Sequence, residues 1–278
     1  MSIKNKELDH DIEMFKKYKN LLGELTKKNV KMKYRNSWLG ILWSFFQPLL
    51  NMIVLSVVFG GLFGAKGGDV ICYPIYLFTG RLLFSFFTTA TKQAMTSFRS
   101  NQAIIKKVYV PKYMYPLSSI LSSFVNLAIS LLCLICVWIF FRASGISGGD
   151  KLAVTPYALL CWVPMLILLV FATGIGLILS VVSVFFRDIE YIWDVLSQLL
   201  FYMVPIIYHI DAIETEWIVK VIKINPLYSM IEMFRSCILY GEIMDWHMLL
   251  YSLIIAVCSL IIGIIFFNWK SDEIIYHL

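Results

Sequence analysis

Polar side chains recur at helical spacing inside two stretches of the sequence that are otherwise apolar. In the first stretch, Ser44, Gln47 and Asn51 follow one another at intervals of three and four residues, beside Trp43. Because a polar amide avoids lipid, this face must point toward protein or water. Two interpretations stay open: an interhelical hydrogen bond, or the lining of a passage through a membrane.

The second stretch carries an acid, an amide and aromatic rings on one helical face, at Asp194, Gln198, Phe201 and Tyr208. Aromatic rings offer apolar faces to the C–H groups of a sugar, and acids and amides form hydrogen bonds with its hydroxyl groups. This face therefore suits a path for a bulky, hydroxylated substrate. An ordinary packed interface with one capped carboxylate is the alternative.

One cation, Arg81, lies inside a further apolar stretch. A buried cation near the centre of a membrane helix costs at least ~2.5–3.5 kcal/mol unless it is paired or hydrated. We expect Arg81 to face a polar passage, where it would pair with an acid such as Glu232 or bind a phosphate of the substrate. The alternative is that its side chain reaches back to the membrane surface.

Motifs that mark common enzymes are absent from the sequence. It contains no G-x-x-x-x-G-K-[ST] loop for nucleotide phosphates, no G-x-S-x-G and no H-E-x-x-H. The C-x-x-C at Cys133 and Cys136 has no His or acidic neighbour, which is typical of apolar packing. The sequence therefore predicts no catalytic residues, no metal site and no cofactor bound by this chain.

Composition places these residues in a membrane. Of the 278 residues, 59% are hydrophobic and 15% are charged, and the mean hydropathy is +0.76. In soluble domains about 45–50% of the residues are apolar and about 25% are charged. A bilayer core of about 30 Å needs about 20 apolar residues in a helix. Six stretches meet that length: Trp38–Phe63, Ile71–Thr91, Pro116–Phe141, Tyr157–Phe185, Tyr191–Tyr208 and Met248–Trp269. We therefore predict an all-α integral membrane protein with six transmembrane helices.

The distribution of basic residues predicts the orientation and the domains. Most of the 24 Lys and Arg residues fall on one side if the N-terminus is cytoplasmic, so we expect both termini in the cytoplasm. Residues 1–37 form an amphipathic interface segment, and residues 38–278 form the six-helix transmembrane domain. Residues 209–247 are too polar to span and contain a helix start at Asn225-Pro226, which predicts a re-entrant outer segment.

The second inner loop is basic and unusually apolar. Five basic residues and no acids lie between Lys92 and Lys112, together with Ile104, Ile105 and Val110. A solvated loop does not need these apolar side chains. They indicate a short helix that docks into a groove on a cytoplasmic partner, or one that only touches lipid.

Several short motifs occur in order along nearly the whole chain. They are Lys33-Tyr34-Arg35-x-Ser37-x-Leu39-Gly40-x-Leu42-Trp43 with Pro48-Leu49, Phe78-x-Gly80, Asn101 with Ile105-Lys106-Lys107-Val108-Tyr109-x-Pro111, Phe186-Arg187-Asp188, Pro205-Ile206-Ile207-Tyr208, Asn225-Pro226 and Arg235. In this register the chain resembles the membrane permease subunit of bacterial ABC exporters of polysaccharide or polyol phosphate, the type that exports O-antigen, capsule or teichoic acid. In that family an apolar residue usually follows Phe78-x-Gly80, and here the residue is Arg81.

The resemblance implies partners and a substrate that composition does not show. It implies a homodimer with a central channel, in the bacterial cytoplasmic (inner) membrane, above a dimer of a separate ABC ATPase that holds ATP and Mg. The cargo would be a lipid-linked polysaccharide or a teichoic-acid-like polymer, and nucleic acid has no part in it. An ABC-type drug or peptide exporter, or a stand-alone secondary transporter or flippase, is the alternative.

The resemblance and the polar faces together define two sets of candidate residues. The ATPase-coupling residues are Asn101, Ile105, Lys106, Lys107, Val108, Tyr109, Pro111, Arg187 and Asp188. The substrate-channel residues are Trp43, Gln47, Asn51, Arg81, Gln198, Phe201 and Tyr208.

Overall fold

The computed structural model describes residues 2–35, 37–63, 71–107, 110–152, 155–271 and 273–274, with backbone only for 2–17 and 61–63. Within these ranges the chain is helical and contains no strand, which confirms the predicted all-α class. The α-helices are α1 Ser2–Lys33, α2 Trp43–Phe63, α3 Tyr73–Ser100, α4 Gln102–Ile105, α5 Met114–Ser144, α6 Trp162–Phe185, α7 Ile189–Met203, α8 Glu216–Ile224, α9 Pro226–Arg235 and α10 Trp246–Lys270. Short 3-10 turns and a π turn, Ser236–Tyr240, connect some of them.

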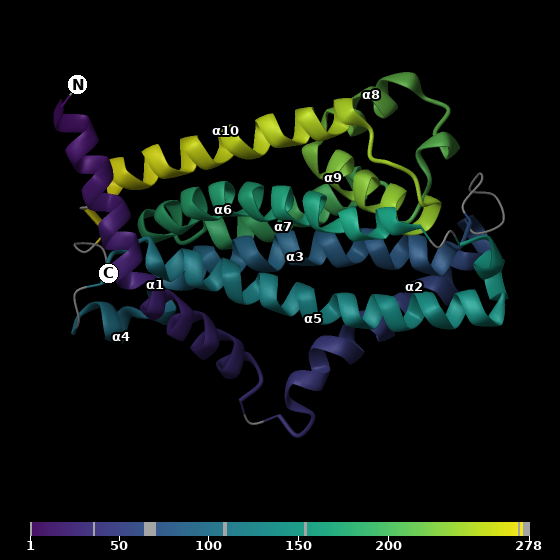
Figure 1. Ribbon diagram of the computed structural model, residues 1–278, viewed down its shortest axis with the longest axis horizontal. Helices are drawn as coiled ribbons and strands as arrows, with labels where there is room; N and C mark the ends of the chain where they lie inside the picture. The colour runs from purple at the N-terminus through teal and green to yellow at the C-terminus, as the bar shows by residue number, and fades with distance from the viewer. Residues whose placement is uncertain are drawn as a thin grey trace.

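The long helices run side by side, with α3 in the middle of the bundle (Figure 1). Helix α3 contacts α2, α5, α6, α7 and α9, and α6 lies between α3 and α10. The start of α1, the end of α10 and the short α4 lie at one end of the bundle, and α8 and α9 lie at the other. We call the first of these the terminal end.

Four segments within the described part of the chain are long and apolar enough to cross a membrane. They are Gly40–Gly60, Met114–Ser144, Pro156–Phe185 and Trp246–Lys270. Helix α3 has the length, 28 residues, but Arg81, Lys92 and Arg99 interrupt its apolar character. Helix α7 has 15 residues and is therefore about 22 Å long, shorter than a bilayer core of about 30 Å. Four of the six predicted spans are thus supported by length and composition.

Helix α7 ends earlier than the sequence predicts. The predicted span continues to Tyr208, whereas α7 stops at Met203 and Val204 is extended, with φ −95° and ψ 130°. The cause is Pro205, which lacks an amide hydrogen and pushes the preceding residue out of the helical region. A non-helical segment, Val204–Tyr208, therefore follows α7.

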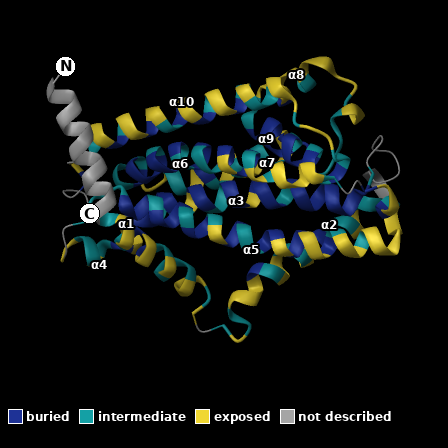
Figure 2. Cartoon of the chain, in the orientation of Figure 1, coloured by how far each residue is buried: buried dark blue, intermediate teal, exposed yellow. Residues whose placement is uncertain are grey.

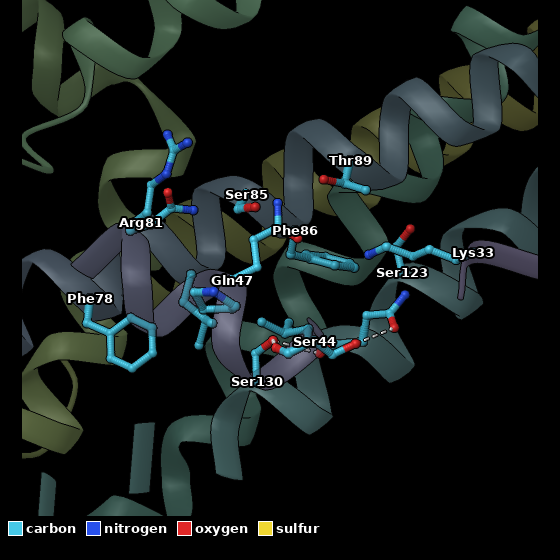
Figure 3. A pocket seen from close by; sticks show the side chains of 15 residues that line it. Lys33, Ser44, Gln47, Phe78, Arg81, Ser85, Phe86, Thr89, Ser123 and Ser130 are labelled. Carbon is cyan, nitrogen blue, oxygen red and sulfur yellow. Dashed lines mark hydrogen bonds between the residues drawn. The ribbon is translucent and has the colours of Figure 1, made fainter. Parts of the chain in front are cut away.

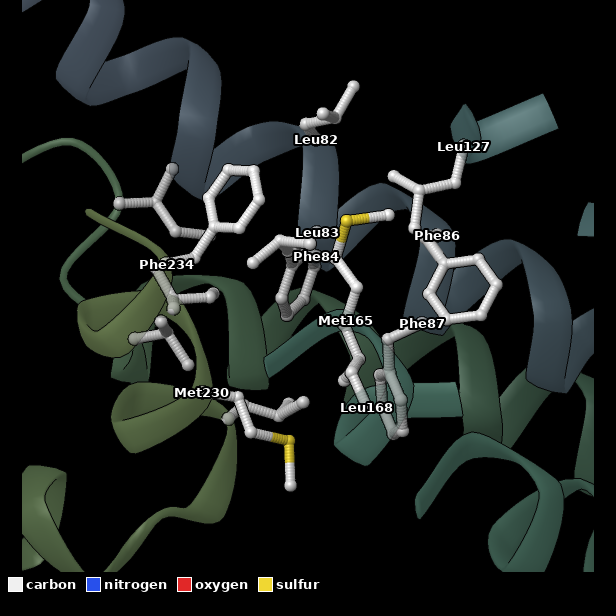
Figure 4. Close-up of a cluster of buried hydrophobic side chains, with 14 of the residues drawn as sticks. Leu82, Leu83, Phe84, Phe86, Phe87, Leu127, Met165, Leu168, Met230 and Phe234 are labelled. Carbon is white, nitrogen blue, oxygen red and sulfur yellow. The ribbon is translucent and has the colours of Figure 1, made fainter. Parts of the chain in front are cut away.

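The core is built around α3, whose residues are mostly buried, while the outer faces of α2 and α10 are exposed (Figure 2). Phe84, Phe86 and Phe87 of α3 meet Met165 and Leu168 of α6 in this core. Met230 and Phe234 add the buried face of α9 to the same cluster (Figure 4).

Small residues let α6 approach its neighbours closely. A Cβ on Gly174 would lie 2.4 Å from the backbone of Ser259, and a Cβ on Gly263 would lie 2.5 Å from the carbonyl oxygen of Gly174. Helices α6 and α10 therefore touch backbone to backbone, a mode of packing that membrane helices favour.

Candidate functional site

A polar cavity of about 280 Å³ lies between α2, α3 and α5 (Figure 3). Its polar lining comes from all three helices and the end of α1: Lys33, Ser44, Gln47, Asn51, Arg81, Ser85, Thr89, Ser123, Asn126 and Ser130. We call it the α2–α3–α5 cavity. The polar face of α2 thus points toward protein, as its spacing predicts.

Within this cavity, Ser44 and the two amides of α2 differ in role. Ser44 is buried, shares a hydrogen bond with the Tyr34 hydroxyl, and accepts one at its backbone carbonyl from Ser130 Oγ at 3.0 Å. Asn126 Oδ1 accepts a hydrogen bond from the Tyr34 hydroxyl at 3.1 Å. Gln47 and Asn51 line the cavity without such a bond among the described residues. Ser44 therefore ties helices together, and the two amides are free to meet a solute.

A larger groove of about 850 Å³ runs between α3 and α7. Its lining combines hydroxyl groups, amides and aromatic rings: Arg81, Phe84, Thr88, Thr89, Lys92, Gln93, Thr96, Trp193, Asp194, Ser197, Gln198, Phe201 and Tyr202. We call it the α3–α7 groove. Arg81 and Thr89 belong to the lining of both hollows, so the two hollows lie next to each other on neighbouring faces of α3.

Charges in the α3–α7 groove are arranged unevenly. Lys92 Nζ lies 2.6 and 2.7 Å from the two carboxylate oxygens of Asp194, so these two charges compensate each other. The guanidinium carbon of Arg81 lies 4.9 Å from the centroid of the Phe201 ring. Among the described residues Arg81 forms no ion pair.

The predicted pairing of Arg81 with Glu232 is wrong. Glu232 Oε2 instead lies 3.4 Å from Nη1 of Arg235, which is one turn further along α9. The guanidinium of Arg81 lies instead over the ring of Phe201 of α7.

The remaining two channel candidates line neither hollow. Trp43 lies at the start of α2, with 41% of its surface exposed. The Tyr208 hydroxyl donates a hydrogen bond to the backbone carbonyl of Tyr202 at 2.8 Å. The structure therefore gathers Gln47, Asn51, Arg81, Gln198 and Phe201 around the two adjoining hollows and leaves Trp43 and Tyr208 outside them.

Sequence reasoning missed a buried arginine at the end of α9. The side chain of Arg235 has 0% exposure, and its guanidinium lies 3.5 Å from the centroid of the Tyr76 ring. Its nitrogens donate hydrogen bonds to the backbone carbonyls of Pro205 at 2.9 Å and Tyr76 at 3.3 Å. Arg235 thereby joins α9 and α3 to the non-helical segment after α7.

Two tyrosine hydroxyls of α3 complete this arrangement. Tyr73 donates to the carbonyl of Ile207 at 2.8 Å, and Tyr76 donates to those of Pro205 and Tyr208 at 3.1 and 3.0 Å. Gly80 leaves space for the guanidinium, because a Cβ there would lie 2.5 Å from Arg235 Nη2. The signal in the sequence was the presence of Gly80, Pro205 and Arg235 as separate motifs, and only the structure shows that they meet.

The predicted coupling residues of the second inner loop lie at the terminal end. Asn101 is buried, donates to the Ser97 carbonyl at 2.9 Å and accepts a hydrogen bond from Lys28 Nζ at 3.2 Å. Ile105 ends α4, Lys106 and Lys107 are exposed, and Pro111 accepts at its carbonyl from the Met114 amide at 3.0 Å, next to α5. Val108 and Tyr109 lie outside the described residues.

The other predicted coupling residues lie in the turn that joins α6 to α7. Arg187 and Asp188 are both exposed there. Arg99, near the end of α3, forms an ion pair of 2.5 Å with Glu190 at the start of α7 and a hydrogen bond of 3.4 Å to the Ser183 carbonyl of α6. Both segments therefore belong to one surface, built where α3, α4, α6 and α7 meet.

Comparison with known proteins finds a family match and several similar export proteins. Residues 20–239 match the model of the ABC-2 type transporter family. The O-antigen export system permease protein RfbA of Klebsiella pneumoniae is 31% identical over 229 residues, which cover 81% of this chain and 82% of the relative. The polysialic acid transport protein KpsM of Escherichia coli is 22% identical over 268 residues, which cover 94% of this chain and 97% of the relative. The capsule polysaccharide export inner-membrane protein CtrC of Neisseria meningitidis is 23% identical over 248 residues, with 87% and 89% covered.

Proposed function

This chain belongs to the ABC-2 type transporter family, and on that premise we propose that it passes a lipid-linked polysaccharide, or a teichoic-acid-like polymer, across the bacterial inner membrane. It is a transport subunit and not an ATPase. A separate ABC ATPase, which holds ATP and Mg, would drive it. The relatives named above export polysaccharides, which favours this cargo over a drug or a peptide, and the family match disfavours a stand-alone transporter or flippase.

The lining of the α3–α7 groove is the main support for a polysaccharide as the cargo. Its walls present the partly exposed ring of Phe201 and the exposed ring of Tyr202, which can pack on the apolar faces of sugar rings. Gln198 and the threonines of α3 supply donors and acceptors for sugar hydroxyl groups. Stacking does not depend on one register, so a chain of sugars can slide while remaining in contact.

The same structure supports a proposal for the membrane arrangement. We propose six crossings, by α2, α3, α5, α6, α7 and α10, with both termini cytoplasmic. The polar face of α3 is tolerated because neighbouring helices and the two hollows keep it from lipid. The crossing by α7 continues through Val204–Tyr208, whose carbonyls obtain their donors from Arg235, Tyr73 and Tyr76. Residues 209–247, with α8 and α9, then form the re-entrant outer segment.

We further propose that two copies of the chain enclose the path. The α3–α7 groove is open on one side, and large apolar side chains, such as Val57 of α2 and Leu199 of α7, are exposed on the helices that supply the channel candidates. A second copy would close the groove and cover these surfaces. The terminal surface, with Lys106, Lys107, Arg187 and Asp188, would then receive the ATPase dimer.

Replacement of a groove ring tests the proposed path. Phe201→Leu keeps an apolar side chain but removes the stacking surface, so we expect export of the polymer to slow about fivefold to tenfold, for a loss of about 1–1.5 kcal/mol. Phe140→Leu, on the exposed face of α5, is the matched control and should export normally. Export would be followed by surface labelling of the polymer at equal membrane levels of the variants. Equal export by Phe201→Leu and the control would exclude the groove as the path.

A further inference from the structure

One positive charge in the α3–α7 groove is not balanced by any described group. The only carboxylate in the lining, Asp194, is engaged by both of its oxygens with Lys92. Glu190 nearby is engaged with Arg99, and Glu232 lies against Arg235. The groove therefore has a net positive charge, and that charge resides on Arg81.

The surroundings of Arg81 leave its donors available. Figure 3 shows the guanidinium pointing away from Ser44 and Ser130, and the guanidinium carbon lies 4.9 Å from the Phe201 ring centroid, across the α3–α7 groove. A ring that packs on the face of a guanidinium supports the cation and leaves the in-plane N–H groups free. No hydrogen bond from the Arg81 side chain is found among the described residues, so the N–H groups of its guanidinium have no acceptor among them.

The same helix face offers further contacts along the groove. Arg81, Thr88, Lys92 and Thr96 all line the groove and are spaced by seven, four and four residues along α3, so they follow one face. An anionic group held by Arg81 would thus have hydroxyl groups and aromatic rings beside it. This combination recognises a ligand that is sugar-like and negatively charged at the same time.

We propose that Arg81 is a binding residue for an oxyanion of the transported substrate, a carboxylate or a phosphate, and that the groove therefore selects acidic cargo. The guanidinium forms charge-assisted hydrogen bonds with two oxygens of that group. The inference rests on the proposed function, because it assigns a charge to the cargo of the same groove. The oxyanion has two sources, an acidic sugar of the polymer or the phosphate that links the polymer to its lipid.

Binding to the full chain in lipid nanodiscs tests the proposal. The probes are hexagalacturonate and its neutral methyl ester, which differ in charge, and farnesyl diphosphate with farnesol as its neutral counterpart. We expect Arg81→Gln to weaken the binding of at least one anionic probe about tenfold or more and to leave the neutral probes unchanged. Arg81→Lys keeps the charge without the guanidinium and should retain part of the affinity. Lys220→Gln, an exposed cation on α8, is the matched control.

Each outcome has a defined meaning. A loss confined to hexagalacturonate identifies an acidic sugar as the source, and a loss confined to farnesyl diphosphate identifies the lipid linkage. Anionic probes that bind Arg81→Gln and the wild type equally would overturn the inference. ATPase-dependent export of a lipid-linked acidic polymer by the wild-type chain, measured in parallel, keeps this result separate from a failure of the proposed function.

Discussion

At the scale of single residues, Arg235 determines how the chain leaves α7. Its guanidinium is fully buried and contacts α3, α9 and the segment after α7; it donates to three backbone carbonyls, those of Tyr76, Pro205 and Ile206, and lies over the Tyr76 ring. A buried cation is tolerated when hydrogen-bond acceptors and an acid compensate it: Nη1 and Nη2 donate to backbone carbonyls and Glu232 lies 3.4 Å from Nη1, whereas Nε has no hydrogen-bond partner among the described residues. Together with the Tyr76 hydroxyl, Arg235 supplies hydrogen bonds to the Pro205 carbonyl, which lies in a non-helical segment.

The space left by Gly80 should be coupled energetically to Arg235. Gly80→Ala places a methyl group 2.5 Å from Nη2, so we expect a destabilisation of about 1–3 kcal/mol, seen as a lower thermal midpoint in detergent. In an Arg235→Leu background the obstacle is gone, and the same change should be close to neutral. Gly60→Ala is the matched control, since its Cβ would meet nothing closer than 4.0 Å. Additive effects of Gly80→Ala and Arg235→Leu would contradict the contact.

Residue spacing predicted which amides face a hollow but not the partners of the charges. Gln47, Asn51 and Gln198 could be placed because a polar amide in an apolar helix must avoid lipid, whatever the fold. The partner of Arg81 could not be placed, because Phe201 is distant in sequence and only the packing of α7 on α3 brings it near.

At the scale of elements, apolar length predicted six spans, and the length and composition of the helices support four of them, without α3 and α7. The four candidate spans, on α2, α5, α6 and α10, stand out because each contains a long apolar window with few charges. Helix α3 lies at the centre of the bundle and borders two polar hollows, so it can retain Arg81 and Lys92. The end of α7 depends on Pro205, which lies inside the predicted span, and on the donors from α3 and α9, which the sequence did not indicate.

The exposed lysines after α4 allow a test of the predicted coupling surface. The double change Lys106→Glu and Lys107→Glu reverses two charges at the terminal end, so we expect at least a fivefold loss of ATPase that co-purifies with the chain. The loss should be larger at low ionic strength, because salt screens exposed charges. Lys220→Glu with Lys223→Glu, on α8 at the opposite end, is the control. Co-purification at the level of this control would contradict docking at Lys106 and Lys107.

At the scale of the whole molecule, three regions with different features follow one another along the bundle. The terminal end gathers exposed charges and the turns between helices, the middle contains the two polar hollows, and the opposite end holds α8, α9 and the Arg235 contacts. Helix α3 runs through all three regions and contacts α2, α5, α6, α7 and α9. A displacement that the ATPase imposes at the terminal end would therefore reach the groove through α3 and α7.

The most direct test is transport by purified components in vesicles. The chain would be reconstituted with and without its ATPase, together with the lipid-linked polymer, and polymer exposed on the far side of the bilayer would be counted after MgATP is added. We expect transfer only when the ATPase and MgATP are both present. Transfer at the same rate by the chain alone would contradict the account, because a permease without its own ATPase would then need no motor.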